Sequence, residues 1–225
     1  MPPEHNIRLS TAALAVPLIL AASPAGAWPG GYLGRLQAEA LIQTLRGDLL
    51  SQGSATAVLA RWCAAHRLAD PPRIVARKAE RRETASAETR ALLKVGPREP
   101  LGYRRVELVC GDHVLSAADN WYVPARLTPS MNHALLTTDT PFGAVVAPLG
   151  FQRRTLEATV LFHPMPPGWK AGAATTPSGA DVRLVLPDVL LRVRAILSRR
   201  DGRPISLVVE DYRRGLLDFE PSAPK

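Results

Sequence analysis

The sequence lacks the short motifs that mark the commonest enzyme classes. It contains no GxSxG, no HExxH, no phosphate-binding P-loop and no GxGxxG after a predicted strand. The five histidines, at positions 5, 66, 113, 133 and 163, show no metal-ligand spacing. We therefore expect no metal, nucleotide or serine-hydrolase site, and any reaction should proceed without a cofactor.

Aromatic residues are scarce as well, at 5% of the chain. The net charge is +8 and the isoelectric point about 10.2, but the arginine doublets are distributed along the chain rather than gathered in one segment. A nucleic-acid-binding surface combines a concentrated basic face with aromatic side chains for stacking. We therefore expect no nucleic-acid partner, which leaves a small acidic molecule as a ligand suited to the basic charge.

The chain has only two cysteines and no CxxC motif. Cys63 falls in a predicted helix and Cys110 in a predicted strand, and both segments are apolar. The two could form a disulfide in an oxidising compartment, but a free buried thiol is ordinary in such surroundings. The sequence favours free thiols and leaves the pairing open.

Residues 1–27 have the pattern of a secretory signal peptide. A basic residue, Arg8, precedes an apolar stretch of about 12 residues, and the segment ends in small residues at 25–27. The stretch is shorter than the roughly 20 residues needed to span a bilayer, so we expect no stable membrane span. We expect export to the periplasm or medium and a single domain over 28–225. The alternatives are a buried helix, or an overlong translation start and a cytoplasmic protein.

Apolar periodicity and turn residues predict an α+β fold with a mostly antiparallel sheet of about six strands and three or four helices. Helices are expected over 33–50, 55–68 and 127–138, with shorter helical segments at 91–95 and 140–150. Strands are expected over 73–80, 152–163 and in two hairpins, at 103–123 and 189–212, each turning at a Gly-Asp or Asp-Gly pair. The Pro/Gly/Thr-rich segment 164–181 is predicted to be a lid or a poorly ordered loop.

Two pairs of adjacent charges interrupt predicted strands: Arg104-Arg105 and Glu210-Asp211. Neighbouring residues on a strand point to opposite faces, so one arginine and one acid should point inward. An inward arginine and acid would form a polar floor for a small anionic ligand, or would pair with each other across the sheet. Alternation alone does not say which member of each pair is inward.

An ordered set of segments resembles chorismate lyase, whose fold is shared with the ligand-binding domains of some bacterial transcription regulators. The segments are YRRVELVCGDHVLSAADNWYVPARL at 103–127, TPFG at 140–143, the strand with Arg153-Arg154, and LLRVRAILSRRDGRPISLVVEDY at 190–212. The resemblance covers roughly residues 73–217. It implies a chorismate lyase-like α+β fold and a cofactor-free elimination of pyruvate from chorismate to give 4-hydroxybenzoate.

The resemblance also implies roles for individual residues. Arg105 would hold a substrate carboxylate, Glu210 would face the ring oxygen, and Phe142 and Gly143 would form the pocket wall. Arg153 and Arg192 are further candidates for a second carboxylate. We expect a monomer that binds a small anionic aromatic or dicarboxylic acid.

Two features leave other functions open. An inward Trp121 would fill the pocket, and an exported lyase would seldom meet chorismate, which is made in the cytoplasm. The alternatives are an exported, non-catalytic binding domain of the same fold and a structural or partner-binding protein.

Overall fold

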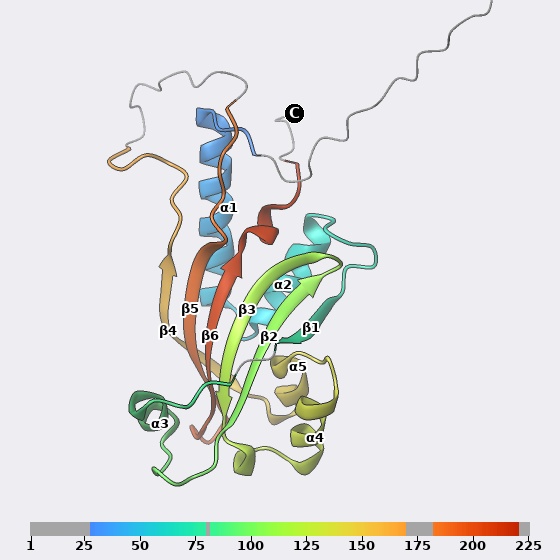
Figure 1. The fold of residues 1–225 in the computed structure, drawn as a ribbon, viewed down its shortest axis with the longest axis vertical. Coiled ribbons are helices and arrows are strands. Elements are labelled where there is room, and N and C mark those ends of the chain that lie inside the picture. The colour runs from blue at the N-terminus through green and yellow to red at the C-terminus, as the bar shows by residue number, and fades with distance from the viewer. Residues whose placement is uncertain (1–27, 80–81, 170–181, 221–225) are drawn as a thin grey trace, which may run out of the picture.

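The six strands of the computed structural model form one antiparallel sheet in the order β1-β2-β3-β6-β5-β4 (Figure 1). The structure describes residues 28–79, 82–169 and 182–220. The strands are β1 (Ile74–Ala79), β2 (Gly102–Cys110), β3 (His113–Tyr122), β4 (Gln152–Val160), β5 (Val189–Ser198) and β6 (Pro204–Arg213). The α+β class and the six antiparallel strands predicted from the sequence are confirmed. The predicted signal peptide and most of the predicted 164–181 loop lie outside the described residues.

Two hairpins make up the centre of the sheet. The β2–β3 hairpin turns at Gly111 and the β5–β6 hairpin at Gly202, and both glycines adopt a positive φ that side-chain-bearing residues rarely take. Pairing of β3 with β6 joins the hairpins, so that Ala118 lies opposite Glu210 and Asn120 opposite Val208. The register of this central pair decides which side chains share a face.

Helices cover the two faces of the sheet unequally. We call the face of the sheet that carries the largest core cluster the inner face. Four helices pack on it: α1 (Tyr32–Ser51), α2 (Ala55–Ala65), α4 (Pro129–Thr137) and α5 (Phe142–Val146). The short helix α3 (Ala87–Leu93) packs on the opposite, outer face, near the lower ends of β5 and β6 in Figure 1. Among the helices of the described residues, none is both long and apolar enough to cross a membrane.

Side-chain caps begin two of the inner-face helices, α2 and α4. Ser54 Oγ accepts a hydrogen bond from Ala57 N at the start of α2, and Thr128 Oγ1 accepts one from Met131 N at the start of α4. Pro129 follows Thr128 at the first helical position, where its missing N–H is not needed.

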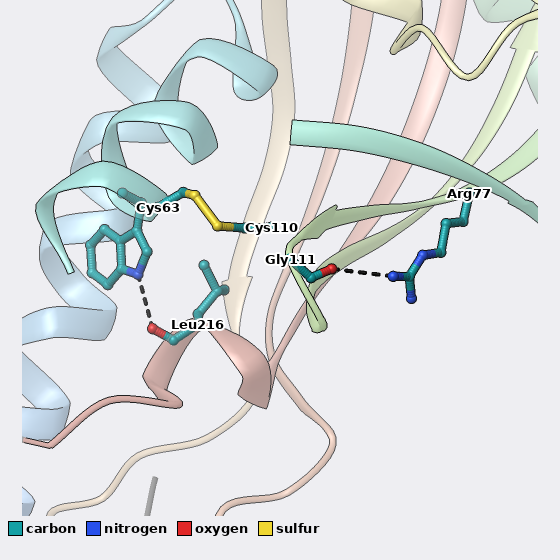
Figure 2. The surroundings of a disulfide bond; sticks show 6 residues. Cys63, Arg77, Cys110, Gly111 and Leu216 are labelled. Atoms are coloured by element: carbon teal, nitrogen blue, oxygen red, sulfur yellow. Dashed lines mark hydrogen bonds between the residues drawn. A yellow bond between two sulfur atoms is a disulfide. The ribbon is translucent and has the colours of Figure 1, made fainter. Parts of the chain in front are cut away.

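Cys63 and Cys110 form a disulfide that joins α2 to the end of β2 (Figure 2). The expectation of free thiols was therefore wrong. Both residues are fully buried, and their Cα atoms lie 6.2 Å apart, within the range that a disulfide requires. An apolar sequence context is the same for a buried thiol and a buried disulfide, so only the packing of α2 against β2 distinguishes them. Next to Cys63 along α2, Trp62 Nε1 donates to the Leu216 carbonyl at 2.9 Å.

Candidate functional site

A pocket lies on the inner face of the sheet, against the first residues of α2 and α5. Its empty volume is about 530 Å³, part of which is open to solvent. Residues of β2 to β6 form the floor, and residues 53–56 and 141–143 contribute the opposite wall. Strand alternation places every floor side chain on the same face, so the charged groups there share one enclosed space.

Four polar side chains of the floor line this pocket: Arg104 on β2, Asn120 on β3, Arg153 on β4 and Glu210 on β6. All are largely buried. Arg104 lies directly opposite Asn120 across the β2–β3 ladder. Two arginines and one glutamate leave one net positive charge among the side chains that line the pocket.

Arg153 and Glu210 form a buried ion pair. The distance from Arg153 Nη2 to Glu210 Oε2 is 2.5 Å and from Nη1 to Oε1 is 3.4 Å, and the two side chains are only 4% and 7% exposed. Tyr212, fully buried, donates its hydroxyl to Glu210 Oε2 at 3.0 Å. Both carboxylate oxygens of Glu210 therefore already accept hydrogen bonds, so Glu210 is not a free proton acceptor.

Burial and charge act on the pKa values of the partners of Glu210. Burial, the largest single effect, lowers the pKa of the Arg153 guanidinium, but the charge of Glu210, the influence of Tyr212 and the hydrogen bond to Glu210 together outweigh it, so that the pKa is raised. Burial also raises the pKa of the Tyr212 hydroxyl well above its usual value, and the Glu210 charge adds to this effect. Arg153 therefore stays charged and Tyr212 stays protonated, and both remain donors to Glu210.

Arg104 has no such partner. Its Nη1 donates to the Thr140 carbonyl at 3.0 Å and its Nη2 to the Thr138 carbonyl at 3.3 Å, while its Nε is buried and makes no hydrogen bond. Within the described part of the chain, no carboxylate forms an ion pair with it. Burial accordingly lowers the pKa of the Arg104 guanidinium from its usual value. The residue is only 7% exposed, and its charge has no carboxylate at ion-pair distance; Asp139, farther away, opposes it only in part.

The remaining walls are mostly apolar. Phe142, Phe151, Leu197 and Val208 are among them, and the hydroxyls of Ser54 and Thr56 stand at the start of α2. A Cβ on Gly143 would lie 3.6 Å from Thr56 Oγ1 and 3.7 Å from Ser54 Oγ. Glycine at this position therefore keeps open the space between α2 and α5.

The structure corrects the predicted position of Arg105. Arg105 points to the outer face, where its Nη1 lies 2.5 Å from Asp119 Oδ2, and the Tyr103 hydroxyl donates to Asp119 Oδ1. Burial and the neighbouring Asp119 raise the pKa of Tyr103 to about 12. Arg105 and Glu210 therefore do not meet, and Arg104 occupies the inner position instead. The resemblance pointed to one arginine of the pair, whereas strand alternation left both open.

Other predicted site residues divide between the faces. Phe142, Gly143, Arg153 and Glu210 line the pocket together. Arg192 lies on the outer face, half exposed, with a bidentate ion pair to Asp211.

Trp121 also lies on the outer face. It packs there with Leu93 of α3, so it does not fill the pocket. Asn120 was not predicted, because alternation places Asn120 and Trp121 on opposite faces without saying which of them is inward.

Fold and pocket together define an α+β domain with a buried, positively charged pocket. Over 194 residues the chain is 50% identical to a protein of Sinorhizobium fredii named "Uncharacterized protein y4mC", and the match covers 85% of this chain and 81% of that protein. The chain therefore belongs to the family of that protein. No family model matches the chain.

Solved structures with related architecture are more distant. The effector domain of PhnF from Mycobacterium smegmatis has a TM-score of 0.44 and 14% identity, covering 72% of this chain and 88% of that one. The ligand-binding domain of a putative GntR-family transcriptional regulator from Bordetella bronchiseptica has a TM-score of 0.39 and 20% identity. The match covers 62% of this chain and 82% of that domain. The possible transcriptional regulator YydK from Bacillus subtilis has a TM-score of 0.39 and 16% identity. The match covers 67% of this chain and 62% of the YydK chain, which is less than two thirds of its length.

Proposed function

We propose that this domain binds a small organic monoanion with an apolar body, and that Arg104 holds its carboxylate. The observation that carries the proposal is the buried Arg104 guanidinium, which has an unused Nε–H and, among the described residues, no carboxylate at ion-pair distance; the more distant Asp139 does not prevent burial from lowering its pKa. Burying a charge without an opposing charge costs several kcal/mol. A ligand carboxylate would supply that charge through short, charge-assisted hydrogen bonds.

The start of α2 adds to the attraction for an anion. Ser54 caps the N–H of Ala57, while the N–H groups of Ala55 and Thr56 belong to the first turn, which lacks intrahelical acceptors. All three residues Ser54, Ala55 and Thr56 line the pocket. The positive end of the α2 dipole is therefore directed toward the same space as Arg104.

The size of the pocket favours a small ligand. Its empty volume of about 530 Å³ includes space open to solvent, so the enclosed part is smaller. Pockets that enclose drug-sized ligands measure about 300–1,000 Å³. We therefore expect a ligand no larger than one substituted ring, which enters as the surrounding side chains shift.

Charge-dependent binding tests this proposal. Isothermal titration calorimetry of the purified protein should show binding of benzoate, and benzamide, which has the same shape but no charge, should bind at least about 10-fold more weakly. Arg104→Gln should weaken benzoate binding by about 10- to 100-fold, because a hydrogen bond to a charged group contributes about 1.5–3 kcal/mol. The matched variant Arg105→Gln, on the outer face, should bind as the wild type does. Equal affinity for benzamide, or an equal loss in Arg105→Gln, would refute the proposal.

The resemblance to chorismate lyase implies a reaction as well as binding. Because both oxygens of Glu210 already accept hydrogen bonds from Arg153 and Tyr212, we propose binding without turnover. Incubation with chorismate, followed by absorbance and by pyruvate release, tests this part. Pyruvate formed faster than in a protein-free control, and abolished in Glu210→Gln, would assign the lyase reaction instead.

We also propose that the protein is exported and that residues 1–27 are removed. The disulfide between Cys63 and Cys110 supports this, because disulfides persist in oxidising compartments and are rare in the cytosol. In the native bacterium, the protein should be recovered from the periplasmic fraction or the medium with a new N-terminus near Trp28 and no alkylatable thiol after denaturation. Intact Met1 together with two reactive thiols would show that the protein is cytoplasmic.

A further inference from the structure

Asn120 places a side-chain amide on the floor of the pocket. It lies on β3, between β2 and β6, and the residue is 4% exposed. Its Oδ1 accepts a hydrogen bond from the hydroxyl of Ser206, a fully buried residue of β6, at 2.6 Å. Its Nδ2 donates to no group of the described residues and, unlike the Nε of Arg104, is not fully enclosed. The pocket therefore contains an uncharged donor that has no acceptor.

The bond to Ser206 sets the direction of this amide. The oxygen and the nitrogen of an asparagine side chain lie on separate branches, so an Oδ1 held by Ser206 leaves Nδ2 pointing elsewhere. The opposite orientation, with Nδ2 toward Ser206, would set the amide oxygen against an anionic ligand. An amide already held by a buried neighbour also loses little further rotamer freedom when a ligand binds. Asn120 is thus a preorganised donor.

Asn120 also stands next to Arg104. The two residues lie directly opposite each other in the β2–β3 ladder, and both line the pocket. Directly opposite residues on one face of an antiparallel pair have their Cβ atoms about 4.5–5.5 Å apart. A single small group above them can therefore receive a hydrogen bond from each side chain.

A carboxylate has more acceptor sites than Arg104 can fill. Its two oxygens together offer about four such sites. Both Nη groups of Arg104 already donate to the carbonyls of Thr138 and Thr140, and its Nε is enclosed, so only the second N–H of each Nη group is left for a ligand. A carboxylate on Arg104 therefore keeps acceptor sites for another donor, and Asn120 Nδ2 is an unused donor on the neighbouring strand.

From this arrangement we infer that Asn120 is a second anchor for the ligand carboxylate, which it binds through Nδ2 beside Arg104, and that Ser206 is the positioning residue that holds the amide. The inference rests on the proposed function and names the residue that decides how the acid is oriented. A carboxylate held by Arg104 alone can rotate, whereas one held from two strands has a fixed plane. The direction of its apolar body is then fixed as well.

Asn120→Leu tests the inference, because leucine is similar in size and has no donor. In titration calorimetry, the affinity for benzoate should fall by about 10- to 100-fold, the range for a hydrogen bond to a charged group. The weak binding of benzamide should fall by less, because a hydrogen bond between neutral groups contributes less. An unchanged affinity for benzoate, or an equal loss for the two ligands, would overturn the inference.

A double-mutant cycle tests the role of Ser206. Ser206→Ala should weaken benzoate binding by about 3-fold or more in the wild type and should have no further effect in Asn120→Leu, because it acts only through the amide. The matched variant is Ser116→Ala on β3, since Ser116 is equally buried but does not line the pocket. It should bind benzoate as the wild type does. Equal losses from Ser206→Ala in both backgrounds would contradict the positioning role.

Nuclear magnetic resonance of the isotope-labelled wild type gives a readout that does not depend on any variant. The side-chain amide signal of Asn120 should move downfield when benzoate is added, because one of its protons then binds a carboxylate. If Asn120→Leu does not fold, this measurement decides. A signal that stays in place while benzoate binds would overturn the inference alone. Failure of benzoate to bind the wild type would overturn the proposed function with it.

Discussion

Arg153→Leu is expected to lower the free energy of unfolding by about 3–5 kcal/mol, because it leaves the carboxylate of Glu210 buried without its counter-ion. Glu210 is 7% exposed, and after the substitution its only remaining side-chain donor among the described residues would be Tyr212. Urea or guanidinium denaturation, monitored by tryptophan fluorescence and circular dichroism, measures the change.

Two further variants show whether the loss comes from the unpaired charge. Arg154→Leu, on the same strand but exposed, should change the free energy of unfolding by no more than about 0.5 kcal/mol. The double variant Arg153→Leu/Glu210→Leu should recover most of the loss, since replacing a whole buried ion pair with apolar side chains is often neutral or stabilising. A single variant within about 1 kcal/mol of the wild type would contradict the buried ion pair between Arg153 and Glu210.

Removal of the disulfide is expected to destabilise the protein by about 4 kcal/mol. Cys63 and Cys110 are 47 residues apart, and a crosslink closing a loop of that size restricts the unfolded chain by roughly this amount. The double variant Cys63→Ala/Cys110→Ala should therefore unfold at a markedly lower denaturant concentration than the oxidised wild type.

A reducing agent supplies the control for this comparison. It should destabilise the wild type by a similar amount once the buried bond is reduced in the unfolded state, and it should leave the double variant unchanged. Equal midpoints for the oxidised wild type and the double variant would contradict the expectation, and would indicate that packing around Trp62 and Leu216 holds α2 in place without the bond.

Much of the fold could be predicted from the sequence because its determinants are local. The Gly111 and Gly202 turns need a positive φ that glycine supplies, and the apolar alternation on either side of them specifies antiparallel strands. The cap at Thr128 likewise depends on neighbouring residues alone. Each of these signals acts within about ten residues, so one sequence is enough to detect it.

The pocket was predicted less completely because both faces of the central strands are partly covered. The inner-face helices bury Arg104, and the region around α3 leaves Arg105 only 19% exposed, so neither position has the polarity of a fully solvated face. Alternation states that Arg104 and Arg105 differ in direction, but it assigns no direction to either. The choice of Arg105 rested on the resemblance, and the register with β3 and β6 selects Arg104.

By itself, the sequence determined the strands, the hairpin turns, the helix caps and the requirement that one arginine and one acid point inward. Only the tertiary structure decided that Arg104 faces the pocket, that Arg153 from a distant strand pairs with Glu210, and that Cys63 reaches Cys110. The physical reason is that these three outcomes depend on distances between segments 36 to 57 residues apart. Such distances follow from sheet register and helix packing, and no local pattern of residues encodes them.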